Sequence, residues 1–559
     1  MDTNSSTTRA AGATPKGTPN TQGKVKQQLS RALPALTFLV ILCTSAILLR
    51  GPDLLLNMPF NPDEAELLAQ GRRAQVSLFP PYESFTTTTH TLLWPMFMGA
   101  LGLIGIPLGF VTAHIIAAVA YVLLAFTMYL VTAHHLGWKI AFLLVLPSSI
   151  WILSLTGDFL SLSSELLPML MIALAVLIFS LPRTSPTLPR LVAAAVILGC
   201  VFWAKPQLTP VAASITLTLI LITVLSTRHG SPARSVGRLT IAMVGVTGFL
   251  APTIMVLVVL LASNNLVNFY EETVLYQLSY VTERDTLGGQ SPNMLIRPSL
   301  AAIFVTGFAP AVLWALAAFV VWVNRSGASD RSIINWQVAI WIIPMVAAFV
   351  TLTMAFPLFD HYANILFVSF MTSGTLVIAT TSWWTSALTR NEASSVTVEV
   401  AFLVALVVIS LSILPRIWDN GSIWRDGNIR FSSQDVSSEP LTAICPPNSR
   451  VVVWGWASEL YAWFSWIPAS RFVNSWQLAP LINIDRHKQA LEAELAANPP
   501  DCIVEANGDG FFGSRLLPGS FTDTMQGSSA FLDSCYQYSR EQLSDQRFVD
   551  VWRKTTQCG

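Results

Sequence analysis

A pair of carboxylates opens a short polar segment directly after the first long apolar run of the chain. The stretch from Asn61 to Arg73 reads Asn-Pro-Asp-Glu-Ala-Glu-Leu-Leu-Ala-Gln-Gly-Arg-Arg. Charge within reach of a bilayer is costly unless it is solvated, paired or used. Asp63 and Glu64 supply carboxylates that can remove a proton, and Arg72 with Arg73 supplies cations that can bind an anion. One short helix is therefore predicted to carry both kinds of chemistry.

The same residues also have purely structural interpretations. Asp63 follows Asn61-Pro62, where an acidic residue suits a helix N-terminus through capping and the helix dipole. Glu66 points in a different direction from Glu64 and is suited to a solvated or structural role. Arg72 and Arg73 are also suited to contact lipid headgroups.

The composition indicates a polytopic membrane protein. Hydrophobic residues make up 53% of the chain and charged residues only 11%, against roughly a quarter charged in soluble domains. The formal net charge is zero, and no basic cluster interleaved with aromatic residues predicts nucleic-acid binding. The polar composition of residues 1–32 predicts a disordered cytoplasmic tail. A cleaved signal peptide is not expected, because the first apolar run begins too late and continues as a full span.

Apolar runs long enough to cross a bilayer number about eleven. We expect the spans near 33–50, 108–132, 139–156, 165–181, 190–204, 207–226, 239–262, 299–323, 334–354, 362–385 and 397–414. Basic residues between them fall on alternate loops, which the positive-inside rule assigns to the cytoplasm together with the N-terminus. Keeping that alternation requires a hairpin turn at Lys205-Pro206, and it sends everything after Pro415 to the outside.

Residues 416–559 are predicted to form a small external α/β domain. Val451-Val452-Val453-Trp454 and Cys502-Ile503-Val504 are typical of buried strands, and 486–498 has helical apolar spacing. Four of the six cysteines lie in this segment. An even set outside the membrane fits an oxidising compartment and disulfide bonds, with three pairings left open.

The loops on the predicted external side hold the other candidate residues. The first of them, 51–107, contains the acidic helix, a Thr-rich turn ending at His90, and an apolar segment that we interpret as an interfacial helix. Shorter outward turns expose Asp158 with Glu165, Lys205, and Asp360-His361-Tyr362.

These motifs together resemble the membrane glycosyltransferases of the C-type fold. The pattern is most similar to the protein-mannosyltransferase and aminoarabinose-transferase-like group, which is glycosyltransferase family 39-like. The resemblance extends from about residue 33 onward and rests on the acidic helix, the Thr-rich turn with its apolar helix, Ser163-Ser164-Glu165, Lys205-Pro206-Gln207, His361-Tyr362 and Trp454-Gly455-Trp456. The sequence departs from the group at His90-Thr91-Leu92-Leu93-Trp94-Pro95, where such proteins often have Gly-Pro-Leu or Lys-Pro-Pro.

The resemblance implies a transmembrane glycosyltransferase domain over 33–415. Its donor would be a sugar on a polyprenyl phosphate, and its acceptor a glycan, glycolipid or protein on the external face of the cell membrane. Asp63 would be the general base, with Glu64 sharing the proton, positioning the acceptor or binding a divalent metal.

The remaining candidates would bind the donor and the substrate. A leaving lipid phosphate needs cations where charge accumulates, so Arg72, Arg73, Lys205 and His361 are the predicted phosphate ligands. The predicted substrate contacts are His90, Glu165 and Tyr362. No cofactor is certain.

Two other classes stay open. One is an O-antigen or polysaccharide polymerase or ligase, which would also be membrane-bound with an external site. The other is a non-catalytic transporter or assembly protein of envelope glycans, although no internal repeat of the kind found in transporters is evident.

Overall fold

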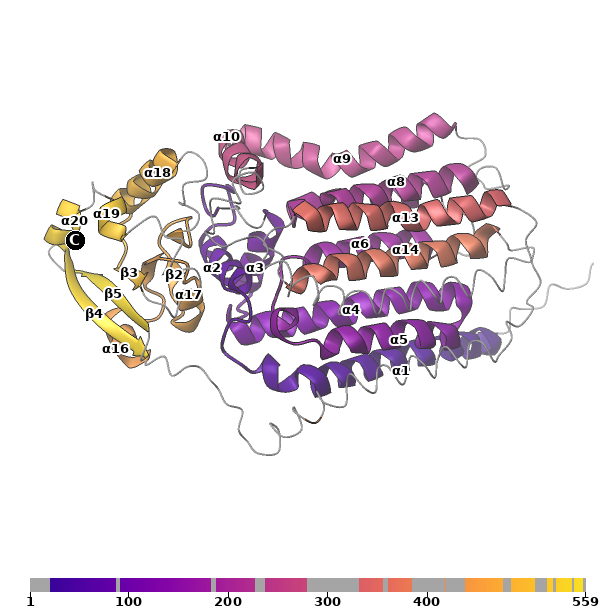
Figure 1. Ribbon diagram of the computed structural model, residues 1–559, viewed down its shortest axis with the longest axis horizontal. Helices are drawn as coiled ribbons and strands as arrows, with labels where there is room; N and C mark the ends of the chain where they lie inside the picture. Colours follow the sequence, from indigo (N-terminus) through magenta and orange to yellow (C-terminus); the bar gives the residue numbers. More distant parts are fainter. Residues whose placement is uncertain are drawn as a thin grey trace, which may run out of the picture.

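A bundle of long helices forms most of the molecule, and a smaller α/β domain lies at one end of it (Figure 1). The computed structural model describes residues 21–86, 91–181, 187–226, 237–278, 331–354, 360–384, 418, 438–475, 484–507, 520–525, 529–544 and 547–555.

The bundle helices run side by side (Figure 1). Among the described residues they are α1 (Thr21–Leu54), α4 (Phe110–Leu136), α5 (Trp138–Ser154), α6 (Leu166–Ser180), α7 (Leu188–Gly199), α8 (Thr209–Ser226), α9 (Arg238–Ala262), α13 (Arg331–Met354) and α14 (Ala363–Trp384). Five segments are long and apolar enough to cross a membrane by themselves, within α1, α4, α8, α9 and α14, and shorter apolar helices accompany them.

These helices coincide with nine of the predicted spans in the part of the chain that the structure describes. The spans predicted at 299–323 and 397–414 lie outside the described residues, so the count of eleven stays a prediction. The hairpin predicted at Lys205-Pro206 is present, because α7 ends before this turn, α8 begins after it, and the two helices contact each other.

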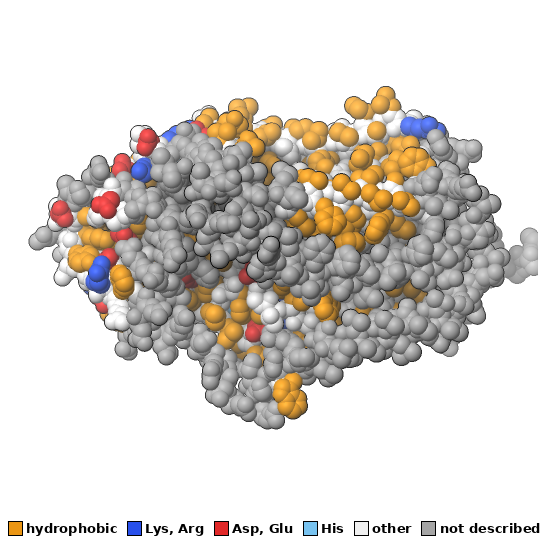
Figure 2. All heavy atoms as spheres, viewed as in Figure 1, with side chains coloured by type: hydrophobic (Ala, Val, Ile, Leu, Met, Phe, Trp, Pro, Cys, Tyr) orange, Lys and Arg blue, Asp and Glu red, His pale blue; other side chains and the backbone are white. Residues whose placement is uncertain are grey.

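Apolar side chains cover the flank of the bundle. Figure 2 shows hydrophobic side chains along this flank, whereas acidic and basic side chains gather mainly over the α/β domain. The outer face of α9 is typical, since Leu239, Met243, Leu250, Ile254 and Val258 are all exposed. Such a surface is stable against lipid tails and not against water.

Two short helices, α2 (Pro62–Val76) and α3 (Leu93–Leu103), lie between the bundle and the α/β domain (Figure 1). They pack closely because glycines lie at their contact: a Cβ on Gly71 would lie 2.4 Å from Met98 Cβ. The acidic helix begins where predicted, since Asn61 is its N-cap and accepts a 2.7 Å hydrogen bond from the Asp63 amide.

The α/β domain contains one mixed sheet in the order β2-β1-β3-β5-β4. Its elements are α16 (Ser438–Ile444), β1 (Arg450–Trp454), α17 (Glu459–Trp463), β2 (Ile467–Pro468), α18 (Ile484–Ala497), β3 (Cys502–Asn507), α19 (Phe521–Thr524), α20 (Ser529–Cys535), β4 (Tyr536–Ser544) and β5 (Arg547–Lys554). Strands β2, β1 and β3 are parallel, and β5 and β4 continue antiparallel. Successive residues of β1 enter cores on opposite faces of the sheet, as strand geometry requires.

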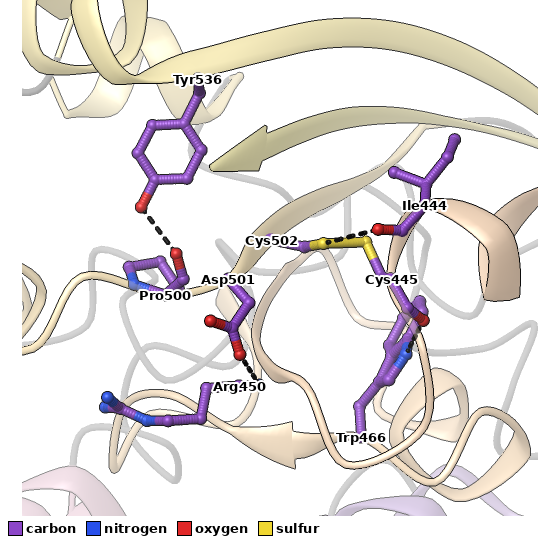
Figure 3. The surroundings of a disulfide bond; sticks show 8 residues. All are labelled: Ile444, Cys445, Arg450, Trp466, Pro500, Asp501, Cys502 and Tyr536. Atoms are coloured by element: carbon purple, nitrogen blue, oxygen red, sulfur yellow. Dashed lines mark hydrogen bonds between the residues drawn. A yellow bond between two sulfur atoms is a disulfide. The ribbon is translucent and has the colours of Figure 1, made fainter. Parts of the chain in front are cut away.

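A disulfide joins α16 to the start of β3 (Figure 3). It links Cys445 to Cys502 with their Cα atoms 6.2 Å apart. The Trp466 indole donates to the Cys445 carbonyl at 2.8 Å, and the Asp501 carboxylate next to Cys502 accepts from the Arg450 amide at the start of β1. The bond therefore lies in a fixed and buried part of the domain.

Candidate active site

Side chains from four separate segments meet around one buried lysine at the end of the bundle that carries α2. Lys205 lies in the turn between α7 and α8, and its Nζ donates to Ser164 Oγ at 2.5 Å. The same Nζ lies 3.4 Å from Glu165 Oε1 and 3.9 Å from Asp63 Oδ2. We call Asp63, Asp158, Ser164, Glu165, Lys205 and His361 the Lys205 cluster. Its members come from segments that lie 40 or more residues apart in the sequence.

His361 completes the cluster from the short helix η7 (Asp360–Tyr362). Its Nδ1 lies 2.9 Å from Asn61 Nδ2 and 3.2 Å from Asp158 Oδ2, and its Nε2 lies 3.6 Å from Glu165 Oε2. The neutral ring can accept from the Asn61 amide at Nδ1, whereas the protonated ring can donate to Asp158.

The charges around His361 favour its protonated form. Burial lowers the pKa of His361, but the carboxylates of Glu165, Asp158 and Asp63 raise it by more, so the pKa lies above its ordinary value of 6.5. Lys205 is the other cationic side chain of the cluster, and the Tyr362 ring lies 6.0 Å from its Nζ. Protonated His361 and Lys205 would give the site two positive charges against three carboxylates.

The two adjacent acids of α2 are directed to different places. Glu64 is fully buried, and its Oε1 accepts from the Leu162 amide at 2.8 Å. Its Oε2 lies 3.3 Å from His114 Nε2 and accepts from the Phe60 amide at the same distance. Asp63, in contrast, keeps 18% of its side chain exposed while lying against Lys205. The two carboxylates therefore have separate partners.

The segment 155–165 between α5 and α6 is held from several sides. It contains the short helix η1 (Gly157–Leu160) with Asp158, followed by Ser164 and Glu165. The Glu64 carboxylate binds the Leu162 amide, and the Trp94 indole of α3 donates to the Ser164 carbonyl at 2.8 Å. Buried polar groups need hydrogen-bond partners, and these bonds hold the backbone of the segment in one conformation.

Arg72 and Arg73 are directed away from the Lys205 cluster. The Arg72 guanidinium donates to the Leu108 carbonyl at 3.0 and 2.6 Å, and Arg73 Nε donates to the Ser84 carbonyl at 2.8 Å. Burial lowers the pKa of Arg72 to about 10, which leaves it charged at neutral pH. Nine residues separate Arg72 from Asp63, or about 13 Å along a helix axis.

The α/β domain packs on the other face of α2. Glu66 accepts from Gln70 at 2.9 Å and from Asn474 at 3.4 Å, and the fully buried Ala69 belongs to a hydrophobic core of the domain. The Trp463 indole donates to the Asn57 carbonyl before α2 at 2.9 Å.

A second group of buried charges joins this domain to the loops beside α2. Arg471 donates to the Tyr82 carbonyl at 2.5 Å and lies 3.1 Å from Glu494 and 3.9 Å from Glu272. We call Arg471, Glu272, Glu494 and Tyr82 the Arg471 cluster.

The structure thus brings together Asp63, Lys205, Glu165, His361 and Tyr362 of the predicted site residues. Glu64 contacts the Leu162 amide and His114. Arg72 and Arg73 contact backbone carbonyls away from Lys205. His90 lies outside the described residues. Sequence reasoning gave no role to Ser164 or Asn61 at the site and treated His114 as structural. The signal that was available for Ser164 was the polar Ser163-Ser164-Glu165 run directly before an apolar helix. Among the described residues, no group of three or more His, Cys, Asp or Glu is arranged to hold a metal ion.

Comparison with known proteins identifies the fold. No protein-family model matches the chain, and no curated protein sequence matches it. The crystal structure of ArnT from Cupriavidus metallidurans bound to undecaprenyl phosphate is similar over 94% of this chain and 98% of that one, with a TM-score of 0.51 and 13% identity. The chain has the fold of ArnT.

The apo-state crystal structure of the same ArnT covers 96% of this chain and 98% of that one, with a TM-score of 0.44 and 15% identity. The likeness to the undecaprenyl-phosphate complex confirms the predicted resemblance to C-type-fold membrane proteins at the level of the fold. It extends over the bundle and the α/β domain alike, because nearly the whole of both chains is covered.

Proposed function

We propose that the protein is a membrane glycosyltransferase that takes a sugar from a polyprenyl-phosphate donor. The similar ArnT structure holds undecaprenyl phosphate, and the apolar flank of the bundle allows a lipid-linked donor to reach the site from the bilayer. The acceptor would be a glycan, glycolipid or protein outside the membrane.

The observation that carries this proposal is the position of Asp63 within the Lys205 cluster. A general base must reach the hydroxyl of an incoming acceptor, and Asp63 is partly exposed at the N-terminus of α2. In our proposal its carboxylate takes the acceptor proton as the new bond to the anomeric carbon forms. The bond from that carbon to the phosphate oxygen breaks at the same time.

Lys205 and protonated His361 would stabilise the leaving phosphate. Both are buried beside Asp63, and cations fixed in a low-dielectric site stabilise developing negative charge without having to reorganise. Glu165 and Asp158 hold these cations in place by direct contacts. Tyr362 lies beside Lys205 and would contact the donor.

Glu64 supports the base by fixing the site instead of sharing the proton. Its carboxylate joins the start of α2 to the Leu162 amide and to His114, so it ties Asp63 to the segment that supplies Asp158 and Glu165. Arg72 and Arg73 are only second candidates for phosphate binding, because each guanidinium is bonded to a backbone carbonyl away from the Lys205 cluster.

The site would face the outside of the cell membrane, with the N-terminus in the cytoplasm. Lys139 and Arg238 begin α5 and α9 at the end of the bundle opposite α2 (Figure 1), which suits a cytoplasmic surface. The Cys445–Cys502 disulfide lies at the α2 end, which suits an oxidising exterior.

The decisive experiment replaces the proposed base. Membranes containing Asp63→Asn and radiolabelled polyprenyl-phosphate sugars should transfer at least about 100-fold less label than wild-type membranes. Asp533→Asn, at an exposed position on α20 of the α/β domain, is the matched control and should transfer normally.

Two results would argue against the proposal. Wild-type transfer by Asp63→Asn would remove the assignment of the base. Failure of wild-type protein to transfer any of a panel of lipid-phosphate sugars, together with unchanged lipid-linked glycans after deletion of the protein, would favour a transporter or assembly role.

A further inference from the structure

Arg50 is a fully buried cation near the end of the predicted first span. It lies in the apolar helix segment Ala32–Leu54, and its side chain has no exposed surface. A charge at such a position is costly unless it is well bonded, and it is retained mainly where it serves a function. The mechanism proposed above does not use Arg50, although its helix contacts η1, which carries Asp158 of the Lys205 cluster.

The first set of Arg50 contacts holds the end of α5. Its Nε donates to the Leu153 carbonyl at 3.1 Å, and its Nη2 donates to the Ile152 carbonyl at 2.9 Å. The last carbonyls of a helix have no partners within the helix and carry a partial negative charge, so a guanidinium suits them. Helix α5 ends at Ser154, and α1 also contacts η1, which carries Asp158.

The second set of contacts leads to His361. The Arg50 guanidinium carbon lies 4.6 Å from the centre of the Tyr121 ring, a distance at which a cation and an aromatic face attract each other. The Tyr121 hydroxyl accepts a 2.8 Å hydrogen bond from Asn364 Nδ2. Asn364 lies in the first turn of α14 and follows His361 of the preceding helix η7 by three residues.

Both partners of the Asp158–His361 contact are therefore connected to one guanidinium. We propose that Arg50 is a positioning residue that sets the distance between Asp158 and His361, through α5 on one side and through Tyr121 and Asn364 on the other. This inference rests on the proposed function for its catalytic meaning. The planar fork of Arg binds two carbonyls and stacks on a ring at once, which the point charge of Lys does not.

The kinetic test compares Arg50→Met and Arg50→Lys with wild type. Both should lower kcat for sugar transfer, Arg50→Met by about 100-fold because small displacements of catalytic groups have effects of that size. The KM for the lipid-linked donor should change little, since Arg50 does not touch the donor site.

The pH dependence of transfer distinguishes a changed position of His361 from a general loss of folded protein. His361 faces Asp158, Asp63, Glu165 and Lys205, and a looser contact with Asp158 weakens the interactions that keep the ring protonated. The alkaline fall of the pH–rate profile should therefore begin at lower pH in Arg50→Met. Arg190→Met, in α7 far from the site, is the matched control and should keep the wild-type profile.

Two milder variants decide the matter if Arg50→Met does not fold. Tyr121→Phe and Asn364→Leu each remove one side of the Tyr121–Asn364 hydrogen bond and leave Arg50 in place. Each should lower kcat by about 10-fold and shift the alkaline fall in the same direction. Wild-type kcat and pH profiles in both variants would overturn the proposal.

A cross-linking measurement tests the positioning without any transfer reaction. Asp158→Cys with His361→Cys, in a chain lacking the free cysteines Cys43 and Cys200, should be joined rapidly by a short bifunctional methanethiosulfonate. Adding Tyr121→Phe should slow this cross-linking. An unchanged rate would contradict the positioning role. Slower cross-linking, together with a protein that retains Asp158 and His361 yet transfers no lipid-linked sugar, would contradict only the proposed function.

Discussion

The Lys205 cluster and the Arg471 cluster are both buried groups of charge beside the same short helix, but they are built differently. Arg471 is surrounded by acceptors on three different segments: Glu494 of α18, Glu272 of the short helix η6 (Tyr270–Leu275), and the Tyr82 carbonyl. Glu494 is partly exposed, but its carboxylate also accepts from the Ser470 hydroxyl and the Arg471 amide. In the Lys205 cluster the partly exposed Asp63 is held more loosely, at 3.9 Å from Lys205 Nζ.

From this difference we assign the Arg471 cluster to the docking of the α/β domain and the Lys205 cluster to the proposed reaction. A buried cation whose acceptors are firmly bonded makes the docking of two segments specific, and it is not available to a substrate. A buried cation whose partner is loosely held and partly exposed, as Asp63 is, can exchange that partner for a substrate anion. We therefore expect variants of the Lys205 cluster to change transfer, and variants of the Arg471 cluster to change stability.

The largest effect is expected for Lys205→Met. Loss of this cation removes a stabiliser of the leaving phosphate, and transfer should fall about 1,000-fold, the upper end of what one such group contributes. The measurement is steady-state transfer of radiolabelled sugar in detergent or nanodiscs. Lys139→Met, at the opposite end of the bundle, is the control. A normal kcat for Lys205→Met would mean that the Lys205 cluster, like the Arg471 cluster, contributes to structure and not to transfer.

A smaller effect, and one that depends on pH, is expected for His361. Its pKa is raised by Glu165, Asp158 and Asp63 against the effect of burial, so the protonated ring persists above its ordinary pKa and is lost as pH rises through the raised pKa. Transfer by wild type should decline across that window. His361→Asn should be slower by about 100-fold at neutral pH and should lack this decline.

The direction in which the transfer rate changes as pH rises decides the role of His361. A wild-type rate that rises with pH across the same window would assign the base function to His361 instead of phosphate binding. Stability follows the same sign, since a raised pKa stabilises the folded state at low pH and that contribution disappears as pH increases.

The smallest effect on transfer is expected for Arg471→Met. Transfer should fall only a few-fold, while the free energy of unfolding of the docked α/β domain should fall by about 1–3 kcal/mol because hydrogen-bonded acceptors lose their donor. Limited proteolysis and thermal unfolding measure the change, and Arg553→Met, at an exposed position on β5, is the control. A large loss of transfer at unchanged stability would place Arg471 in the site.

The elements could be predicted from sequence more completely than the site. Long apolar runs, alternating basic loops and the Lys205-Pro206 break predicted the bundle helices and their hairpin because each signal is local. The start of α2 was equally local, since Asn61 and Pro62 are a favoured cap and first residue.

The partners within the site could not be predicted in that way. Asp63 and Glu64 are neighbours in sequence, yet successive residues of a helix point about 100° apart, so one meets Lys205 and the other Leu162 and His114. The Asn61–His361 contact joins residues 300 positions apart. Their meeting depends on how whole helices pack.

The contact between Ala69 of α2 and the core of the α/β domain has a consequence for biosynthesis. Because the last strand of that domain ends at Lys554, the surroundings of α2 are completed only after nearly the whole chain has been synthesised. Bundle helices that insert earlier leave Ala69 and Glu66 without the partners they have in the finished molecule. The face of α2 that packs on the α/β domain therefore acquires its contacts only when that domain has folded against it.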